Sequence, residues 1–259
     1  MDYQKLYEQM RQIRAFEERL FALFAEGKLV GTTHASIGQE AIAVSVMANL
    51  EKRDIVWSNH RCHAHFLART GDEQALLDEL MGKDTGVCGG RGGSQHLCRD
   101  NFYTNGVLGS TAPVATGMAL AEKKKGSGAI VTLFHGDGAF GEGTIYEALN
   151  MMALWELPVL IVVENNGYAQ STPLSKNLSG TFVDRAKGFG IEADSIKSNR
   201  VEELYPLFKQ RVEQVRATSR PFLQEVVTYR LCPHSKGDDD RPQEEIDAWK
   251  AFDPLKEPS

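Results

Sequence analysis

The chain has 259 residues, of which 42% are hydrophobic and 25% charged, so its composition is that of a soluble globular protein with a sizeable core. A formal net charge of −6 at pH 7 argues against partners such as nucleic acid or an anionic membrane surface. No apolar run is long enough to span a bilayer, and the acid-rich N-terminal stretch is unlike a signal or transit peptide. We therefore expect a cytoplasmic protein.

The spacing of apolar residues predicts an α/β protein with a mostly parallel sheet and helices on both faces. We expect a single domain, in which residues 1–100 form a helical and loop extension and residues 101–259 form the core. In chain order the expected elements are helices over 1–28, 39–50 and 74–81, a glycine-rich loop over 88–98, a helix over 110–125, a strand over 129–134, a helix from about 142, a strand over 158–163, a strand over 191–196, a helix over 202–218 and a strand over 222–229. The acidic run 238–240 is expected to be a solvated loop and the tail 256–259 to be frayed.

The four cysteines, at positions 62, 88, 98 and 232, contain no CxxC pair. This spacing predicts neither a zinc site nor a disulfide framework, and we expect reduced thiols.

Two short polar motifs each follow one of the apolar strands. Gly136-Asp137-Gly138 follows the first strand and Asn165-Asn166 follows the second, with 26 residues between the motifs. Two parallel strands joined by a helix in a right-handed crossover end at the same edge of a sheet. Asp137 and Asn166 are therefore expected to lie side by side, where open α/β sheets bind ligands.

The residue types at this edge suit a magnesium ion and a diphosphate group. Carboxylate, amide and backbone carbonyl oxygens are ligands of Mg²⁺, which also shares phosphate oxygens. Gly136 and Gly138 allow the backbone to approach a phosphate closely, and the helix that follows points free N–H groups the same way. Each motif taken alone is also compatible with an ordinary tight turn. The two together, after two buried strands, favour a Mg²⁺–diphosphate site.

The motifs around these residues resemble those of a known family. The segment from Gly136 to Pro173 is similar to the thiamine-diphosphate motif of the alpha subunits of 2-oxo acid dehydrogenase decarboxylases of the pyruvate, branched-chain and acetoin types. The resemblance runs over about residues 3–254 and includes, in the family's order, HASIGQEAIAV, NHRCHAHFLARTG, GRGGSQHL, NGVLGS and TYRLCPHSKGDD.

The resemblance implies roles for particular residues. Asp137, Asn166 and the backbone carbonyl of Tyr168 would bind Mg²⁺. The other expected cofactor contacts are Arg61, Gly106, Leu108, Gly136, Gly138, Ala139, Arg230 and His234. His63 and His234 are the expected catalytic residues, with His34 and His96 as weaker candidates to face the substrate. The glycine-rich segment 88–98 is expected to be a structural loop near the substrate entrance, not a phosphate loop.

The resemblance also implies partners. In the two-chain members of the family, the glutamate that activates thiamine diphosphate belongs to a beta subunit, so an α₂β₂ assembly is expected. The substrate would be a small 2-oxo acid, pyruvate first, with the acyl unit passed to a lipoyl carrier. The alternatives are transfer of a two-carbon unit from a ketose-type donor to a lipoyl or acyl carrier protein, and a non-catalytic scaffold. This chain departs from the family pattern at His60, where a tyrosine is usual, at residues 197–200 and after Asp240, and the family's further C-terminal segment does not follow Pro254.

Overall fold

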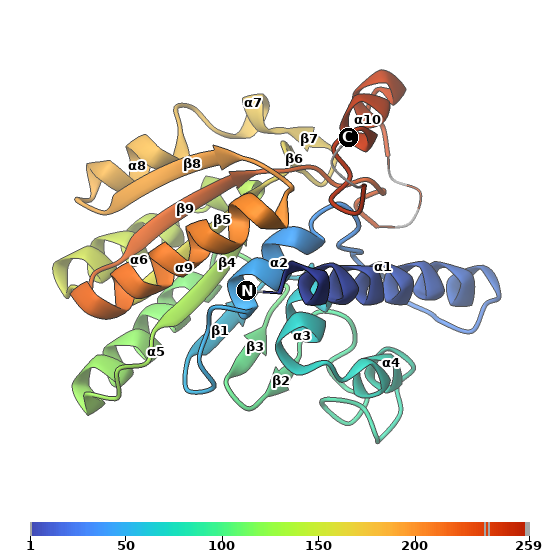
Figure 1. The fold of residues 1–259 in the computed structure, drawn as a ribbon, viewed down its shortest axis with the longest axis horizontal. Helices are drawn as coiled ribbons and strands as arrows, with labels where there is room; N and C mark the ends of the chain where they lie inside the picture. Colours follow the sequence, from blue (N-terminus) through green and yellow to red (C-terminus); the bar gives the residue numbers. More distant parts are fainter. Residues whose placement is uncertain (1, 236, 238, 257–259) are drawn as a thin grey trace.

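A computed structural model describes residues 2–235, 237 and 239–256 of the chain. Its centre is a seven-stranded sheet in the order β2-β3-β1-β4-β5-β9-β8, in which only the β2–β3 pair is antiparallel (Figure 1). The strands are β1 Ile55–Ser58, β2 Cys98–Arg99, β3 Phe102–Thr104, β4 Val131–Gly136, β5 Val159–Asn165, β8 Glu192–Lys197 and β9 Phe222–Val227. A separate antiparallel pair, β6 Tyr168–Ala169 and β7 Thr172–Pro173, follows β5.

Helices cover both faces of the sheet (Figure 1). The residues of β5 point alternately to the two faces: Leu160 and Val162 join one apolar cluster, while Ile161 and Val163 join the other. The first cluster includes α1 Tyr3–Ala25, α2 Glu40–Met47, α3 His63–Thr70 and α9 Val201–Thr218. The second includes α5 Thr111–Lys125, α6 Gly143–Leu154 and α8 Phe182–Gly188. The remaining helices are α4 Glu73–Leu80, η1 Asp137–Gly141 (a 3₁₀ helix), α7 Leu174–Asn177 and α10 Gln243–Lys250.

The predicted crossover is confirmed. β4 and β5 are parallel neighbours with α6 between them in the chain, and their register runs from Val131 opposite Val159 to Gly136 opposite Glu164. β4 continues two residues beyond the predicted end because the pairing with β5 extends through His135 and Gly136. The turn also differs from the expectation, since η1 stands between Gly136 and α6.

The first hundred residues are not only helices and loops, as the sequence predicted. β1 lies inside the sheet between β3 and β4, and α3 follows it after four residues. β1 was missed because it is four residues long and is buried on both faces, so it has no alternating polar pattern. Consequently residue 100 is not a boundary between an extension and a core, because both parts supply strands to one sheet.

The C-terminal part of the chain includes residues outside those that the structure describes. The predictions for Asp238 and for residues 257–259 fall outside the described residues. Asp239, however, forms a hydrogen-bonded ion pair with Arg241 at 2.6 Å, so its carboxylate is held by a neighbouring side chain and is not freely solvated. Within the part of the chain that the structure describes, no helix has both the length and the apolar character needed to cross a bilayer.

Candidate functional site

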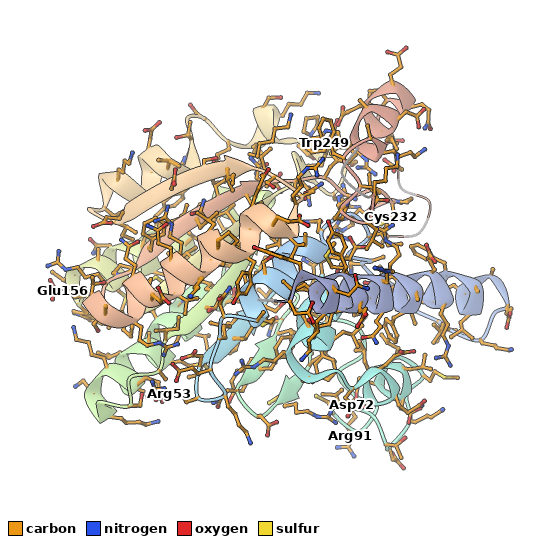
Figure 2. The ribbon with its side chains drawn as sticks, in the orientation of Figure 1. Arg53, Asp72, Arg91, Glu156, Cys232 and Trp249 are labelled. Carbon is orange, nitrogen blue, oxygen red and sulfur yellow. The ribbon has the colours of Figure 1, made fainter. Side chains whose placement is uncertain are left out.

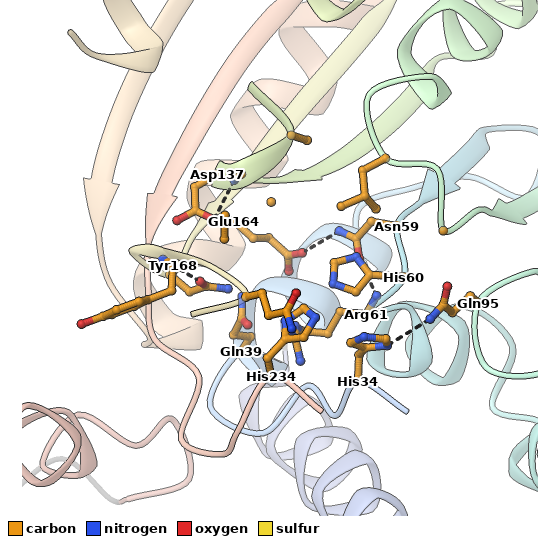
Figure 3. A pocket seen from close by; sticks show the side chains of 18 of the residues that line it. His34, Gln39, Asn59, His60, Arg61, Gln95, Asp137, Glu164, Tyr168 and His234 are labelled. Carbon is orange, nitrogen blue, oxygen red and sulfur yellow. Dashed lines mark hydrogen bonds between the residues drawn. The ribbon is translucent and has the colours of Figure 1, made fainter. Parts of the chain in front are cut away.

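A cavity of about 370 Å³ opens at the carboxyl edge of the sheet. The loops that follow five parallel strands, β1, β3, β4, β5 and β9, bring their residues to it (Figure 3). Asp137 and Asn166 both line it, as the crossover predicted. The lining residues are His34, Gln39, Asn59, His60, Arg61, Gln95, Gly106, Leu108, Gly136, Asp137, Gly138, Ala139, Glu142, Glu164, Asn166, Tyr168, Ala169, Gln170 and His234.

Asp137 presents a buried carboxylate with one uncommitted oxygen. Its side chain is 2% exposed, and Oδ1 accepts a hydrogen bond from the Gly138 N–H at 2.9 Å. Oδ2 is buried and has no hydrogen-bond partner among the residues described. Burial raises the pKa of this carboxyl group to about 6, although the Gly138 N–H and Arg230 act in the opposite direction. A buried anionic oxygen without a donor is an arrangement that a bound cation stabilises.

The two asparagines at the end of β5, Asn165 and Asn166, make different contacts. Asn165 donates to Glu225 Oε1 at 2.7 Å, which ties the turn to β9, and its own Oδ1 accepts from the Gly167 N–H. Asn166 lines the cavity, and its Oδ1 accepts from the Tyr168 N–H at 3.2 Å. Gly167 has φ of +82°, a conformation that glycine adopts without strain, so it allows the chain to reverse at this point.

Glycine is required where η1 meets β6. A Cβ atom on Gly138 would lie 2.6 Å from the Cβ of Ala169, which is closer than such atoms approach. A Cβ on Gly136 would have no atom of the chain within 4 Å, because Gly136 borders the open cavity. The two glycines therefore differ, Gly138 being needed for packing and Gly136 leaving its backbone accessible to a ligand.

Two buried guanidinium groups lie at the same edge. Arg61, 5% exposed, donates to the Ala35 carbonyl at 2.6 Å and to Nδ1 of His234 at 3.3 Å. Arg230 is 1% exposed and donates through Nη2 to the Gln170 carbonyl, while its Nε and Nη1 have no partner among the described residues. Burial, together with Arg61 and Arg241, lowers the pKa of Arg230 to about 10. An unpaired buried cation of this kind is stabilised by an anion.

Three imidazoles gather beside Arg61 (Figure 3). The nitrogen atoms of His34, His60 and His234 lie within 4.8 Å of one another, a spacing also compatible with a metal ion. Burial and the positive charge of Arg61 hold the pKa of His60 well below its ordinary value. Because a guanidinium only donates, Nδ1 of His234 must accept from Arg61. A fixed positive charge against the cluster favours an anionic group beside it over a cation.

The structure does not bring His63 and His96 into the cavity. His63 is 0% exposed and points toward α1, where its Nδ1 lies 3.1 Å from Glu17 Oε2 and its ring meets Phe16 edge-on. His63 is the first residue of α3, and its side chain lies between α3 and α1, away from the carboxyl edge of the sheet. His96 lies in the glycine-rich loop, near the backbone of Gly106. Arg230 does not line the cavity either, but it reaches the site through Gln170.

Several lining residues were not predicted from the sequence, and one set forms a buried network. Glu164 accepts from Asn59 Nδ2 at 3.3 Å and lies 3.2 Å from Nε2 of His65, whose Nδ1 is 2.7 Å from Ser58 Oγ. Asn59 Oδ1 in turn accepts from the Arg61 N–H at 2.7 Å. The network therefore fixes the loop after β1 to the end of β5. The only sequence signal for it was the position of Glu164 next to Asn165. The other unpredicted lining residues are Gln39, Gln95, Glu142, Ala169 and Gln170.

Fold and site together define an α/β protein with a pocket at the carboxyl edge of a mostly parallel sheet, where a buried carboxylate and buried guanidinium groups meet. Comparison with known proteins identifies the class more closely. The model of the family described as "Dehydrogenase E1 component" matches residues 8–257. The chain is 38% identical over 265 residues to a pyruvate dehydrogenase E1 component subunit alpha of Rickettsia bellii, covering 99% of this chain and 80% of that protein. It is 37% identical over 237 residues to the alpha subunit of an acetoin:2,6-dichlorophenolindophenol oxidoreductase of Bacillus subtilis, covering 90% and 71% respectively.

The chain belongs to the dehydrogenase E1 component family. The resemblance drawn from its motifs is thereby confirmed, and the mostly parallel sheet agrees with the fold of that family. Membership makes the chain a component of an enzyme and implies thiamine diphosphate as cofactor and a beta subunit as partner.

Proposed function

We propose that this chain is the alpha subunit of a 2-oxo acid dehydrogenase, which decarboxylates pyruvate or a similar small 2-oxo acid and passes the acyl unit to a lipoyl carrier. The observation that carries the proposal is that one sheet edge holds a buried carboxylate oxygen, Asp137 Oδ2, and two buried guanidinium nitrogens, Nε and Nη1 of Arg230, which have no hydrogen-bond partner among the described residues. A divalent cation with a diphosphate would neutralise both. The relative named for pyruvate supports a small 2-oxo acid as the substrate class. On sequence grounds we place the protein in the cytoplasm.

The residues present fit Mg²⁺. Asp137 Oδ2 is the uncommitted anionic ligand, and the Asn166 amide oxygen has a second lone pair besides the one used by the Tyr168 N–H. The backbone carbonyl of Tyr168 would be a third oxygen from the protein. Oxygen donors from a carboxylate, an amide and a carbonyl, completed by diphosphate oxygens and water, are the set that Mg²⁺ prefers.

The arginines fit the diphosphate. Arg230 offers two nitrogens that have no partner among the described residues, and Arg61 approaches from the opposite loop, after β1. Planar guanidinium groups bind phosphate oxygens through paired hydrogen bonds. Gly136, Gly138 and Ala139 line the cavity on the side of η1, with the backbone of Gly136 the most open, while Gly106 and Leu108 line the part of the cavity next to the loop after β3. We propose that these last two contact the aminopyrimidine.

When bound, thiamine diphosphate supplies the nucleophilic carbon and the electron sink that decarboxylation needs. The residues of this chain would orient the substrate. His234, held by Arg61, and His34 present imidazoles next to a fixed positive charge, which suits the carboxylate of a 2-oxo acid. His63 would not contact the substrate, because its side chain is buried against Glu17.

The glutamate that activates the cofactor would come from the beta subunit. The two glutamates that line the cavity are already engaged within this chain, since Glu142 accepts from the Gly109 N–H at 2.9 Å and Glu164 holds Asn59 and His65. The proposal is therefore an α₂β₂ assembly with the cofactor between unlike subunits.

The test is reconstitution with a beta-type subunit. We expect the complex, supplied with thiamine diphosphate and Mg²⁺, to release CO₂ from pyruvate, and the chain alone to release none. Asp137→Ala and Arg230→Gln in the complex should each weaken cofactor binding at least tenfold, measured by quenching of tryptophan fluorescence. Unchanged affinity in both variants would overturn the site assignment, and turnover by the chain alone would overturn the role given to the partner.

One observation favours the alternative of two-carbon transfer. His60 adds a third imidazole where the family usually has tyrosine, so the cavity is rich in groups that can bind a hydroxylated donor. The same complex separates the two activities. A higher kcat/KM for hydroxypyruvate than for pyruvate would favour two-carbon transfer, and the opposite order supports the 2-oxo acid dehydrogenase.

A further inference from the structure

The glycine-rich loop after α4 is organised around one carboxylate. Glu79, 1% exposed, accepts hydrogen bonds from the backbone N–H groups of four residues, at distances of 2.6 to 3.1 Å. These residues are Cys88, Gly90, Gly92 and Gly93. A Cβ atom on Gly90 would lie 2.4 Å from the carbonyl carbon of Gly82, and one on Gly92 would lie 2.0 Å from the His96 carbonyl oxygen. The loop is therefore compact, and its backbone returns closely upon itself.

This compact path brings together two cysteines that are ten positions apart. The Cys98 N–H donates to Sγ of Cys88 at 3.2 Å, and that sulfur also lies 3.8 Å from the Cys98 carbonyl oxygen. The Cys88 sulfur is thus in contact with the backbone nitrogen of Cys98, and that nitrogen is three bonds from the sulfur of Cys98 itself. Rotation about χ1 of Cys98 can bring them toward the bonding distance of about 2.05 Å.

The two thiols also differ from the others in accessibility. Cys98 is exposed and Cys88 is half-buried, whereas Cys62 and Cys232 are buried elsewhere in the fold; all four are free thiols in this structure. Arg91, within the loop, points outward at the edge of the molecule (Figure 2), and Arg99, next to Cys98 in the chain, is ion-paired with Asp72. The exposed position of Cys98 makes it the thiol of the pair that a small oxidant in solution reaches first.

We propose that Cys88 and Cys98 are a modification site: a thiol pair that peroxide converts to an intrachain disulfide closing the loop 88–98. In the first step the exposed Cys98 thiolate attacks hydrogen peroxide, which takes up a proton, giving a sulfenic acid and one water. Cys88 then attacks that sulfur, the S–S bond forms and a second water leaves. The balance is two thiols and one hydrogen peroxide to one disulfide and two waters. Cys88 acts second because burial raises the pKa of its thiol.

The loop connects this pair to the cavity. Gln95 lies between the two cysteines, lines the cavity, and has its Nε2 3.4 Å from Nδ1 of His34. Thr104, at the end of β3, donates to the Gln95 carbonyl and accepts from the Leu97 N–H. A covalent ring through residues 88–98 restricts the motion of Gln95, so oxidation would change the contact of Gln95 with His34 in the imidazole cluster. Reducing agents would restore the open loop.

The experiment uses the full chain, first reduced and then treated with a small excess of hydrogen peroxide under native conditions. Intact mass should fall by two hydrogen atoms, free thiols should fall from four to two, and a protease digest should contain one peptide pair linked through Cys88 and Cys98. Dithiothreitol should restore all four thiols. The readout requires no cofactor, so it is independent of the proposed function.

Matched variants make the outcome decisive. Cys62→Ser and Cys232→Ser should still lose two hydrogen atoms, whereas Cys88→Ser and Cys98→Ser should not. In Cys88→Ser, the sulfenic acid on Cys98 should remain and react with dimedone. The proposal is overturned if wild-type Cys88 and Cys98 are both alkylated after peroxide treatment, or if the only disulfide formed joins two chains.

Discussion

The buried carboxylate of Asp137 lowers the stability of the chain without a cation, and would bind the metal ion in the cofactor complex that we propose. Its pKa is raised from 3.8 to about 6, so the folded chain binds this proton more tightly than the unfolded chain does. The contribution to stability is complete below pH 3.8 and is lost as the pH rises through 6. The ionised carboxylate therefore destabilises the cation-free chain by about 3 kcal/mol at neutral pH.

We predict that Asp137→Asn increases the free energy of unfolding of the cofactor-free chain by about 2 to 3 kcal/mol at pH 8. The gain should fall to about half of that at pH 5, since the carboxyl of the folded wild type is then largely protonated while that of the unfolded chain is still largely ionised. Urea unfolding at the two pH values measures both numbers. The exposed Asp240→Asn serves as the control and should change stability by less than about 0.5 kcal/mol. An equal gain at both pH values would contradict the burial argument.

The same proton predicts the pH dependence of metal binding. In the proposed site Mg²⁺ would bind the ionised form of Asp137, so below pH 6 each bound cation would displace one proton. We expect the apparent Mg²⁺ affinity, in the presence of thiamine diphosphate, to fall about tenfold per pH unit below 6 and to be constant above 7. Titration calorimetry in buffers of different ionisation enthalpy counts the proton directly. No proton release at pH 5.5 would argue against Asp137 as a ligand.

At the scale of the elements, α4 and the loop that follows it are coupled through Glu79. Burial by itself would raise the pKa of this carboxyl, but the backbone donors at Cys88, Gly90, Gly92 and Gly93 outweigh it, and the net pKa is lowered. The depressed pKa stabilises the fold above the unfolded value of about 4.5, and the contribution is lost as the pH falls through the folded value.

We predict that Glu79→Gln lowers the free energy of unfolding by about 2 to 4 kcal/mol at pH 7, since an amide has only one acceptor oxygen for the four N–H groups. Amide hydrogen exchange should accelerate over residues 88–93 in particular. Glu73→Gln, on the same helix, is the matched control: its ion pair with Arg19 is about half exposed, so a change below about 1 kcal/mol is expected. If the two variants are equally stable, the carboxylate does not organise the loop.

At the scale of the whole molecule, Arg14 joins segments that are far apart in the chain. Its Nε lies 2.5 Å from Glu40 Oε1 on α2, and its Nη2 lies 2.9 Å from Asp253 Oδ1 beyond α10. The Glu40 side chain is 0% exposed and accepts in addition from the Gly38 N–H. Trp249 on α10, labelled in Figure 2, stacks on Tyr229, which follows β9, so the C-terminal segment is held to the rest of the fold at two points.

We predict that Arg14→Met lowers the free energy of unfolding by about 3 to 5 kcal/mol, because it leaves the buried Glu40 carboxylate without its cation. Asp253→Asn should cost about 1 kcal/mol or less, since Asp253 is partly exposed. The double variant Arg14→Met with Glu40→Gln should recover part of the loss, because no buried charge then remains. Chemical denaturation of the three variants gives the comparison, and no recovery in the double variant would contradict the mechanism.

The elements differ in how well sequence alone predicts them. β4, α6 and β5 were predictable because long apolar runs and a helical period are local properties of consecutive residues. β1 was not, because four buried residues have no period of their own, and α3 was missed with it. The resemblance placed His63 in the site because it lies in the matched motif NHRCHAHFLARTG, but a helix turns successive side chains to different faces, and His63 faces Glu17.

The α/β class, the crossover and the meeting of Asp137 with Asn166 follow from local sequence patterns, since a strand, a helix and a parallel strand in succession connect in one handedness and end at one shared edge. The family also follows from the sequence, through motifs spread over almost the whole chain. Which distant loops reach that edge follows from the three-dimensional fold alone. Arg61, His234 and Arg230 come together there because the strand order places β1 and β9 on either side of the β4–β5 pair. Strand order depends on pairing between segments that lie far apart in the sequence, and no local pattern specifies it.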